Sequence, residues 1–193
     1  MLKVPRAGRV KTRLGRDIGM TAAAWWYRHQ VTRLLRRLRD PRWRIVLAVS
    51  PDQAAGLGSG SGLGSVAGRG WPGDLWRIPQ GAGDLGARMR RAMDGLPPGP
   101  VVLIGSDIPD VRPAHIAQAF AALGGRDLVF GPAPDGGFWL VGHSRRRPAP
   151  WGFMRGVRWS SRHALADTQA TWPGAKTAQV AALRDVDTAV DLI

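Results

Sequence analysis

"VVLIGSDIPDVRPAHIAQAFAALGGRDLVFGPA" (residues 101–133) predicts, in turn, a buried strand, a helix and a second strand. The segments 101–105 and 127–133 are continuous apolar runs, which are typical of strands buried on both faces. Between them, 113–125 has apolar residues at helical spacing and Pro113 in its first turn. Strand, helix and strand in this order favour a parallel sheet covered by helices.

The same alternation extends through most of the chain. Helices are expected at 20–39, 83–96 and 160–169, with a short one after 185–188, and strands at 43–50, 75–80 and 135–144. The predicted fold is an α/β sandwich with a mostly parallel central sheet and helices on both faces. We expect a single domain over 1–193, in which the Gly/Ser-rich segment 54–70 is a flexible loop.

The composition limits which side chains can take part in catalysis or metal binding. The chain carries a net charge of +14 and has neither cysteine nor glutamate. Disulfides, thiolate metal sites and a cysteine nucleophile are therefore excluded, and a metal ligand or general base must be Asp, His or a neutral polar group. The charge marks either a nucleic-acid or phosphate partner or arginines on solvated helix faces; we favour the second, so nucleic acid is not the expected partner. No apolar run is long enough for a membrane span or a signal peptide, and we expect a cytoplasmic protein.

Two segments could bind phosphate and metal. In "KVPRAGRVKTRL" (3–14), a turn of small residues precedes the two cations Lys11 and Arg13, with the hydroxyl of Thr12 between them. Such a loop either cradles a phosphate or is simply a basic chain end. Asp107 follows the strand at 101–105, and ligands of open α/β sheets lie beyond the carboxyl ends of strands. Asp107 is therefore a candidate Mg²⁺ or Mn²⁺ ligand, with a plain turn as the alternative.

Two further segments contain carboxylates next to turn residues. Asp135 precedes Gly136 and Gly137, a pair that lets the backbone pass close to a ligand but is also a common hairpin signal. In "RDVDTAVDL" (184–192), Asp185 and Asp187 could reach a metal, although on local grounds capping of the last helix by Asp187 or Thr188 is favoured.

Taken in order, six segments resemble a known pattern. They are "KVPRAGRVKTRL" (3–14), "GAGDLGARMRRAM" (81–93), "VVLIGSDIPDV" (101–111), "GPAPDGGFWLVG" (131–142), "RWSSRHAL" (158–165) and "LRDVDTAVDL" (183–192). Together they look like the bacterial glycosyltransferase-like family also called the radical-SAM/selenodomain-associated transferase, long catalogued as a domain of unknown function. That family belongs to the GT-A nucleotide-diphospho-sugar transferase superfamily. The resemblance implies a Rossmann-like GT-A sandwich. Because the chain begins at Met1-Leu2-Lys3, the first strand of that fold is expected to be truncated.

The resemblance also implies roles for individual residues. Asp107 and Asp187 would bind the metal, Asp135 and Lys11 would be catalytic, and Gly136 and Gly137 would line the acceptor side. The residues implied in nucleotide or phosphate binding are Lys3, Pro5, Gly8, Lys11, Thr12, Arg13, Gly83, Asp84 and Arg88.

The expected activity is a Mg²⁺- or Mn²⁺-dependent transfer from a nucleotide-activated donor, in the first instance a nucleotide sugar, to an unknown acceptor. The residues leave two alternative functions open. One is a nucleotidyltransferase that releases pyrophosphate from a nucleoside triphosphate, similar to the molybdenum-cofactor and phospholactate guanylyltransferases. The other is a non-catalytic basic protein that binds nucleotides or nucleic acid.

Overall fold

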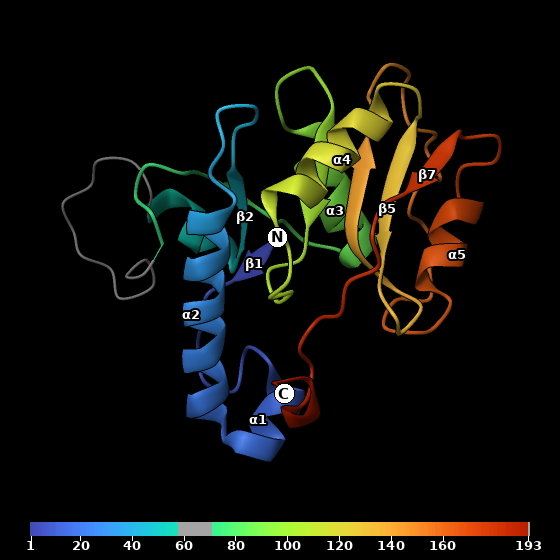
Figure 1. Cartoon of the computed structure of the whole chain (residues 1–193). Helices are drawn as coiled ribbons and strands as arrows, with labels where there is room; N and C mark the ends of the chain where they lie inside the picture. Colours follow the sequence, from blue (N-terminus) through green and yellow to red (C-terminus); the bar gives the residue numbers. More distant parts are fainter. Residues whose placement is uncertain (58–70, 193) are drawn as a thin grey trace. The chain divides into compact units, whose positions relative to one another are not determined.

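The computed structural model describes residues 1–57 and 71–192 (Figure 1). By its internal contacts the chain forms two compact units. The first unit is Met1–Gln80, Ser106–Val111 and Asp185–Ile193, and the second is Gly81–Gly105 and Arg112–Arg184. The single domain expected over 1–193 stays a prediction.

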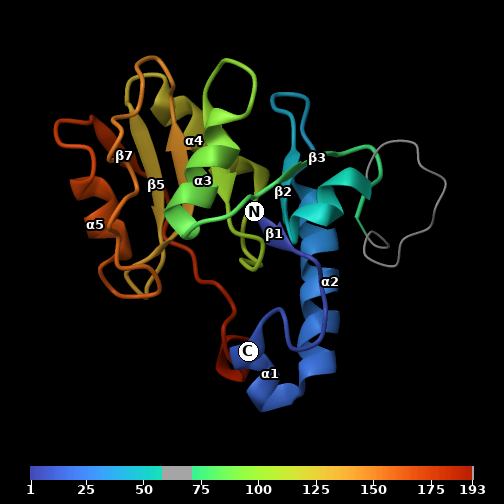
Figure 2. The ribbon, with the colours of Figure 1, turned by 180° about the vertical axis from the view of Figure 1, so that it is seen from behind.

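The first unit contains a three-stranded sheet and two helices joined by Gly19. Its elements are β1 (Leu2–Lys3), α1 (Thr12–Ile18), α2 (Met20–Arg37), β2 (Val46–Ser50), the 3-10 helix η1 (Asp52–Leu57), β3 (Trp76–Pro79) and the 3-10 helix η3 (Ala189–Leu192). The sheet has the order β1-β2-β3, which Figure 2 shows from behind, and both strand pairs are parallel. Leu2 pairs with Val49, and Val46 pairs with Trp76.

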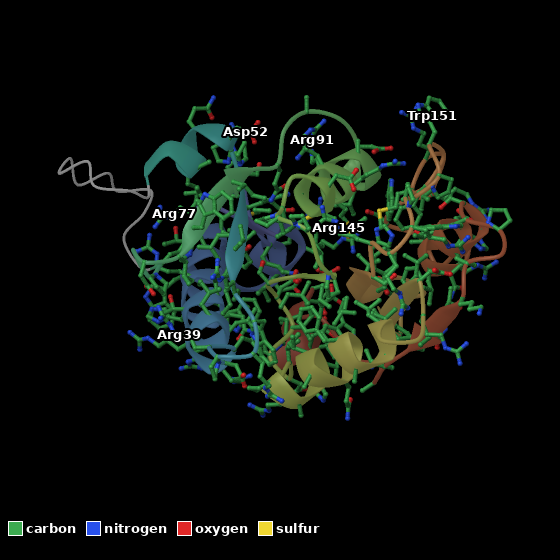
Figure 3. All side chains as sticks on the ribbon, turned by 90° about the horizontal axis from the view of Figure 1, so that it is seen from above. Arg39, Asp52, Arg77, Arg91, Arg145 and Trp151 are labelled. Atoms are coloured by element: carbon green, nitrogen blue, oxygen red, sulfur yellow. The ribbon has the colours of Figure 1, made fainter. Side chains whose placement is uncertain are left out.

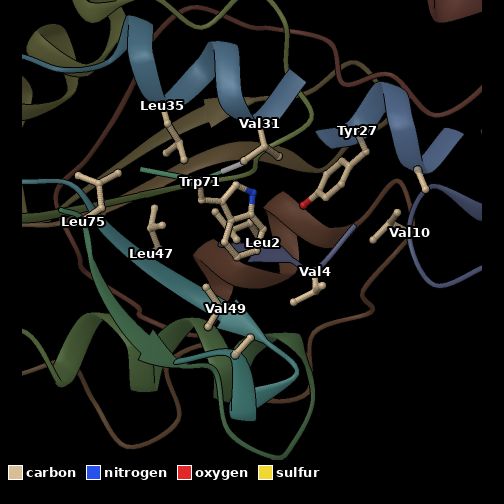
Figure 4. Close-up of a cluster of buried hydrophobic side chains, with 12 residues drawn as sticks. Leu2, Val4, Val10, Tyr27, Val31, Leu35, Leu47, Val49, Trp71 and Leu75 are labelled. Carbon is tan, nitrogen blue, oxygen red and sulfur yellow. The ribbon is translucent and has the colours of Figure 1, made fainter. Parts of the chain in front are cut away.

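The core of this unit lies where α2 covers the sheet (Figure 4). Tyr27, Val31 and Leu35 recur at helical spacing and are buried on one face of α2. They pack with apolar side chains from β1 and β2, among them Leu2 and Val49. Amphipathic periodicity therefore places α2 as the sequence predicts.

Two buried polar side chains tie this core to its backbone. The amide of Gln80 donates to the carbonyl oxygens of Leu2 (3.0 Å) and Ala48 (2.9 Å), one in each of two neighbouring strands. The hydroxyl of Tyr27 lies 2.7 Å from the hydroxyl of Ser106 and accepts from the backbone N–H of Lys3 at 3.1 Å. Because buried polar groups are costly without partners, these contacts fix the position of β1 and of the segment that begins at Ser106.

The second unit is built on a four-stranded sheet of order β4-β6-β5-β7. Its elements are α3 (Leu85–Asp94), β4 (Val101–Ile104), α4 (Pro113–Leu123), β5 (Leu128–Pro132), β6 (Phe138–His143), α5 (Ala164–Ala170) and β7 (Thr177–Gln179). β6 runs antiparallel to β4 and β5, whereas β5 and β7 are parallel. α4 packs against β4, β5 and β6, and α3 packs against β4.

The predicted α/β class is confirmed, and the strands form two sheets. β6 reverses direction because the turn at Asp135–Gly137 is the hairpin that the Asp-Gly signal allowed: Ala133 N–H donates to Gly137 O at 3.0 Å. Of the loop expected at 54–70, residues 54–57 belong to η1, and 58–70 lie outside the described residues. Within the described residues, none of the helices combines the length and apolar character needed to cross a membrane.

The hairpin glycine Gly136 yields a stability prediction. Its φ is +85°, and a Cβ built there lies 2.2 Å from the carbonyl oxygen of Arg162. Gly136→Ala combines a left-handed backbone with a backbone clash, so we expect the free energy of unfolding to fall by about 2 kcal/mol or more. At the matched control, Gly125→Ala, no heavy atom lies within 4 Å and φ is outside the left-handed region. Equal denaturant midpoints for the two variants would contradict this placement.

The buried hydroxyl of Tyr27 yields a second prediction. Tyr27→Phe removes one oxygen and leaves the Ser106 hydroxyl without this partner, so stability should fall by about 1–2 kcal/mol in urea unfolding. Trp25→Phe is the control, because Trp25 lies on the same helix and is 64% exposed. It should change stability by less than about 0.5 kcal/mol. A Tyr27→Phe variant as stable as the control would show that the hydroxyl is not paired.

Candidate active site

Three segments far apart in sequence meet in the first unit. They are the loop from β1 into α1, the segment that begins at Ser106, and the segment that begins at Asp185. The backbone N–H of Val186 donates to the carbonyl oxygen of Asp107 at 3.1 Å, which joins the second and third segments directly. Val186 also belongs to a buried cluster with Leu14 of α1 and Ala23 of α2, which adds the first segment.

The alternation Asp-Val-Asp at 185–187 explains why two carboxylates face the same way. In an extended chain, neighbouring side chains point to opposite sides. Val186 is buried, and the half-buried Asp185 and Asp187 flank it. With Asp107 they form a cluster in which one carboxylate oxygen of each residue lies within 4.8 Å of the others.

Asp107 is held by its neighbours in the chain. Ser106 before it is buried against the hydroxyl of Tyr27, and Ile108 after it is 1% exposed. Arg37 donates to the carbonyl oxygens of Pro109 and Val111, which anchors the rest of the segment on α2. The Asp107 carboxylate therefore sits on a fixed backbone, with 26% of its side chain exposed.

Lys11 supplies the positive charge of this cluster. Its ammonium forms an ion pair with Oδ2 of Asp107 and donates to Oδ1 of Asp187 at 2.9 Å, and its side chain is only 8% exposed. The Lys11 backbone is left-handed, with φ 45° and ψ 49°, immediately before α1 begins. Burial lowers the pKa of Lys11, but Asp107 and Asp187 together outweigh burial and raise this pKa above its ordinary value.

Asp187 binds two cations at once. Its Oδ2 accepts from Arg13 at 2.8 Å, in addition to the contact of Oδ1 with Lys11. Burial raises the pKa of Asp187, yet the two cations hold it below its ordinary value. Asp187 therefore stays ionised at neutral pH.

Asp185 shows that the cluster still has an excess of negative charge. Its pKa is raised by burial first and then by the charges of Asp107 and Asp187, while Lys11 offsets only part of this. Oxygen donors with unbalanced negative charge are the ligand set that Mg²⁺ and Mn²⁺ prefer. The residues present therefore fit a divalent cation.

The other residues of the predicted phosphate loop, 3–14, make contacts that differ from those of Lys11 and Arg13. Lys3 donates to Tyr27 only through its backbone, and its side chain is exposed. Pro5 and Gly8 lie in the loop before α1, where Gly8 has a φ of +70°, and Thr12 is the exposed first residue of α1. Lys11 and Arg13 are thus the members of this loop whose side chains bind the carboxylates.

The predicted nucleotide residues Gly83, Asp84 and Arg88 belong to the second unit. Asp84 caps α3 by accepting from the N–H of Ala87 at 2.8 Å, and Arg88 donates to the carbonyl of Gly83 at 2.9 Å. Asp84 also lines an open cavity of about 550 Å³, together with Arg90, Arg91, Asp94 and residues 153–155. Their assignment to a nucleotide stays a prediction.

The predicted acceptor residues form the β5–β6 hairpin of the second unit. Oδ1 of the exposed Asp135 accepts from the N–H of Gly137 at 2.9 Å, so this carboxylate stabilises its own turn. Their role toward an acceptor stays a prediction.

Of the two residues expected to cap the last helix, Thr188 stands directly before η3, and its hydroxyl donates to Oδ2 of Asp191 at 2.9 Å. The same oxygen accepts from the backbone N–H groups of Asp187 (3.1 Å) and Thr188 (2.9 Å). The carboxylate of Asp187 is left for Lys11 and Arg13. The alternating Asp-Val-Asp pattern also identifies Asp185 as a candidate metal ligand. Its short distance to Asp107 in the structure adds it to the cluster.

Several arginines of the second unit bind the protein's own backbone. Arg145 (Figure 3) donates to the carbonyl oxygens of Pro97 (2.6 Å) and Leu96 (3.0 Å), and Arg90 donates to that of Trp151 at 2.9 Å. Arg147 forms an ion pair with Asp127 at 2.8 Å. Much of the positive charge in this unit is therefore engaged by acceptors of the unit itself.

Several solved structures are similar to this chain over most of its length. A "putative nucleotide-diphospho-sugar transferase" from Desulfovibrio desulfuricans G20 is 30% identical, with a TM-score of 0.81, over 99% of this chain and 83% of that one. Rv0371c from Mycobacterium tuberculosis H37Rv is 16% identical, with a TM-score of 0.54, over 99% and 93% of the two chains. A homologue of it from Mycobacterium sp. strain JC1 is 15% identical, with a TM-score of 0.51, over 86% and 79%. The last two show the fold alone.

The chain also matches a protein family over residues 34–161, a range that includes Asp107 and Asp135. No curated protein matches it. Because the family match spans more than half of the sequence, and the 30% identical structure covers nearly all of it, the chain belongs to the family described as "Uncharacterized protein conserved in bacteria (DUF2064)".

Proposed function

We propose that the protein is a metal-dependent transferase with a nucleotide-activated donor, and specifically a glycosyltransferase that acts on a nucleotide sugar. The observation that carries the proposal is the convergence of Lys11 with Asp107, Asp185 and Asp187 in one unit of the chain. The description of the 30% identical relative supports the class of donor.

The cofactor of this proposal is Mg²⁺ or Mn²⁺, held by Asp107, Asp185 and Asp187. Such an ion neutralises charge on a diphosphate as the leaving group departs. Among the described side chains, Lys11 and Arg13 form ion pairs with these carboxylates, and the raised pKa of Asp185 supports a further positive charge at this place.

Lys11 and Arg13 are the proposed ligands of the donor's phosphates, because a compact ammonium and a forked guanidinium both suit phosphate oxygens. The remaining proposed donor-binding residues are Lys3, Pro5, Gly8, Thr12, Gly83, Asp84 and Arg88. Their support is resemblance: the N-terminal segment is similar to the superfamily's nucleotide-phosphate loop, and the segment at 83–88 is similar to a motif that faces the nucleotide.

In the transfer, an acceptor nucleophile forms a bond to the anomeric carbon of the sugar. The bond from this carbon to the diphosphate oxygen breaks, and the nucleoside diphosphate leaves with the electron pair. Asp135 is the proposed base that takes the acceptor's proton, with Gly136 and Gly137 beside the acceptor. The support for this assignment is the resemblance of the segment 131–142 to the family's pattern.

A product assay tests the reaction class. Incubated with nucleotide sugars, Mn²⁺ and candidate acceptors, the protein should release nucleoside diphosphate, and chelation by EDTA should abolish the release. Release of pyrophosphate from nucleoside triphosphates would instead identify a nucleotidyltransferase. Salt-sensitive retention of nucleic acid, with no metal requirement and no product, would point to a basic binding protein.

A matched pair of variants tests the metal ligands. Asp107→Asn removes one charged ligand at nearly constant volume, so Mn²⁺ binding in calorimetric titrations should weaken at least about tenfold. Asp110→Asn makes the same change at an exposed position three residues further along and should bind Mn²⁺ like the unaltered protein. Identical Mn²⁺ titrations of Asp107→Asn and the unaltered protein would remove Asp107 from the site.

A further inference from the structure

The ammonium of Lys11 occupies the same carboxylates that the proposed function gives to the metal. It pairs with Oδ2 of Asp107 and with Oδ1 of Asp187. Oδ2 of Asp187 is taken by Arg13 at 2.8 Å. In this arrangement both oxygens of Asp187 and one oxygen of Asp107 are already bound to cations.

The burial of Lys11 strengthens the effect of its charge on a metal ion at the same carboxylates. Only 8% of the Lys11 side chain is exposed, so water screens its charge weakly. A divalent ion needs oxygen ligands at about 2.0–2.2 Å, which is shorter than any ammonium–oxygen hydrogen bond. A divalent ion on these oxygens would therefore lie within a few ångströms of the ammonium, where the two positive charges repel each other strongly.

We propose that Lys11 is a built-in counter-ion that competes with the divalent cation for Asp107 and Asp187, so that the free ion binds only when the ammonium moves away. This inference rests on the proposed metal site. The flexible four-carbon stem of lysine allows the ammonium to move while the backbone before α1 keeps its place. The donor's diphosphate would give the displaced ammonium a new anionic partner.

The competition explains the backbone of Lys11. Its left-handed conformation is unfavourable for a residue with a Cβ. It puts the lysine stem directly ahead of α1, from where Nζ reaches two segments that are 96 and 176 positions away in sequence (107 − 11 and 187 − 11). A conformation this unfavourable is typical of sites where a side chain must be aimed.

Metal titration of charge-removing variants tests the proposal. Lys11→Met keeps the length of the stem and removes the ammonium, so Mn²⁺ should bind at least about tenfold more tightly than to the unaltered protein, which is about 1.4 kcal/mol. Lys176→Met is the matched control, because Lys176 is exposed and lies in the second unit. It lowers the net charge equally and should leave the Mn²⁺ affinity unchanged.

The outcomes separate the two proposals. If Mn²⁺ binds the unaltered protein in a manner sensitive to Asp107→Asn, but Lys11→Met binds it equally or more weakly, the metal site stands and the competition is refuted. If neither the unaltered protein nor Lys11→Met binds Mn²⁺, the metal site itself is refuted, and the inference falls with it. Lys11→Gln serves where circular dichroism shows that Lys11→Met does not fold.

A second measurement follows the ammonium directly. The chain has three lysines, Lys3, Lys11 and Lys176, which makes the modification of each amine by an acylating reagent easy to resolve by peptide mass spectrometry. Lys11 should be protected without metal and should react faster at Mg²⁺ concentrations that saturate the site, while Lys3 and Lys176 react alike in both conditions. Protection of Lys11 that persists at saturating Mg²⁺ would refute the displacement.

Discussion

The candidate site of the first unit is organised around a buried ammonium between carboxylates that come from two other segments of the chain. Lys11 reaches Asp107 and Asp187 at once, although they lie far away in the sequence. Buried ion pairs contribute little net stability, because desolvation of both charges offsets their attraction. The presence of this pair is therefore better explained by what the carboxylates bind than by the stability of the fold.

Apolar contacts bring these charges together. Val186 is buried beside Leu14, and Ile108 is buried next to Asp107, so the polar residues between them are carried to one place by their apolar neighbours. The backbone hydrogen bond from Val186 to Asp107 fixes the spacing of the two acidic segments. The site is thus an outcome of core packing, and a change in a buried neighbour can displace a carboxylate without touching it.

The arginines of the second unit show that net charge alone does not identify a binding partner. A strongly positive chain suggests an anionic partner. Here the run of arginines at 145–147 binds carbonyl oxygens and one carboxylate of its own unit, as Arg145 and Arg147 illustrate. The informative charges are the few aspartates placed between buried residues.

Many elements of the fold could be predicted from the sequence, since helical periodicity located α2 and apolar runs located β2 to β6. The position of Asp107 at the end of a predicted strand identified it as a candidate ligand. The short elements α1 and β7 escaped prediction, because a few residues carry too little periodicity. The hairpin at Gly136 was an open alternative that only strand pairing decided. By itself the sequence determined the class of the fold and the candidate residues, because these depend on local pattern. Only the tertiary structure decided that Lys11 and the three aspartates meet, because contacts between distant segments are set by how the core packs.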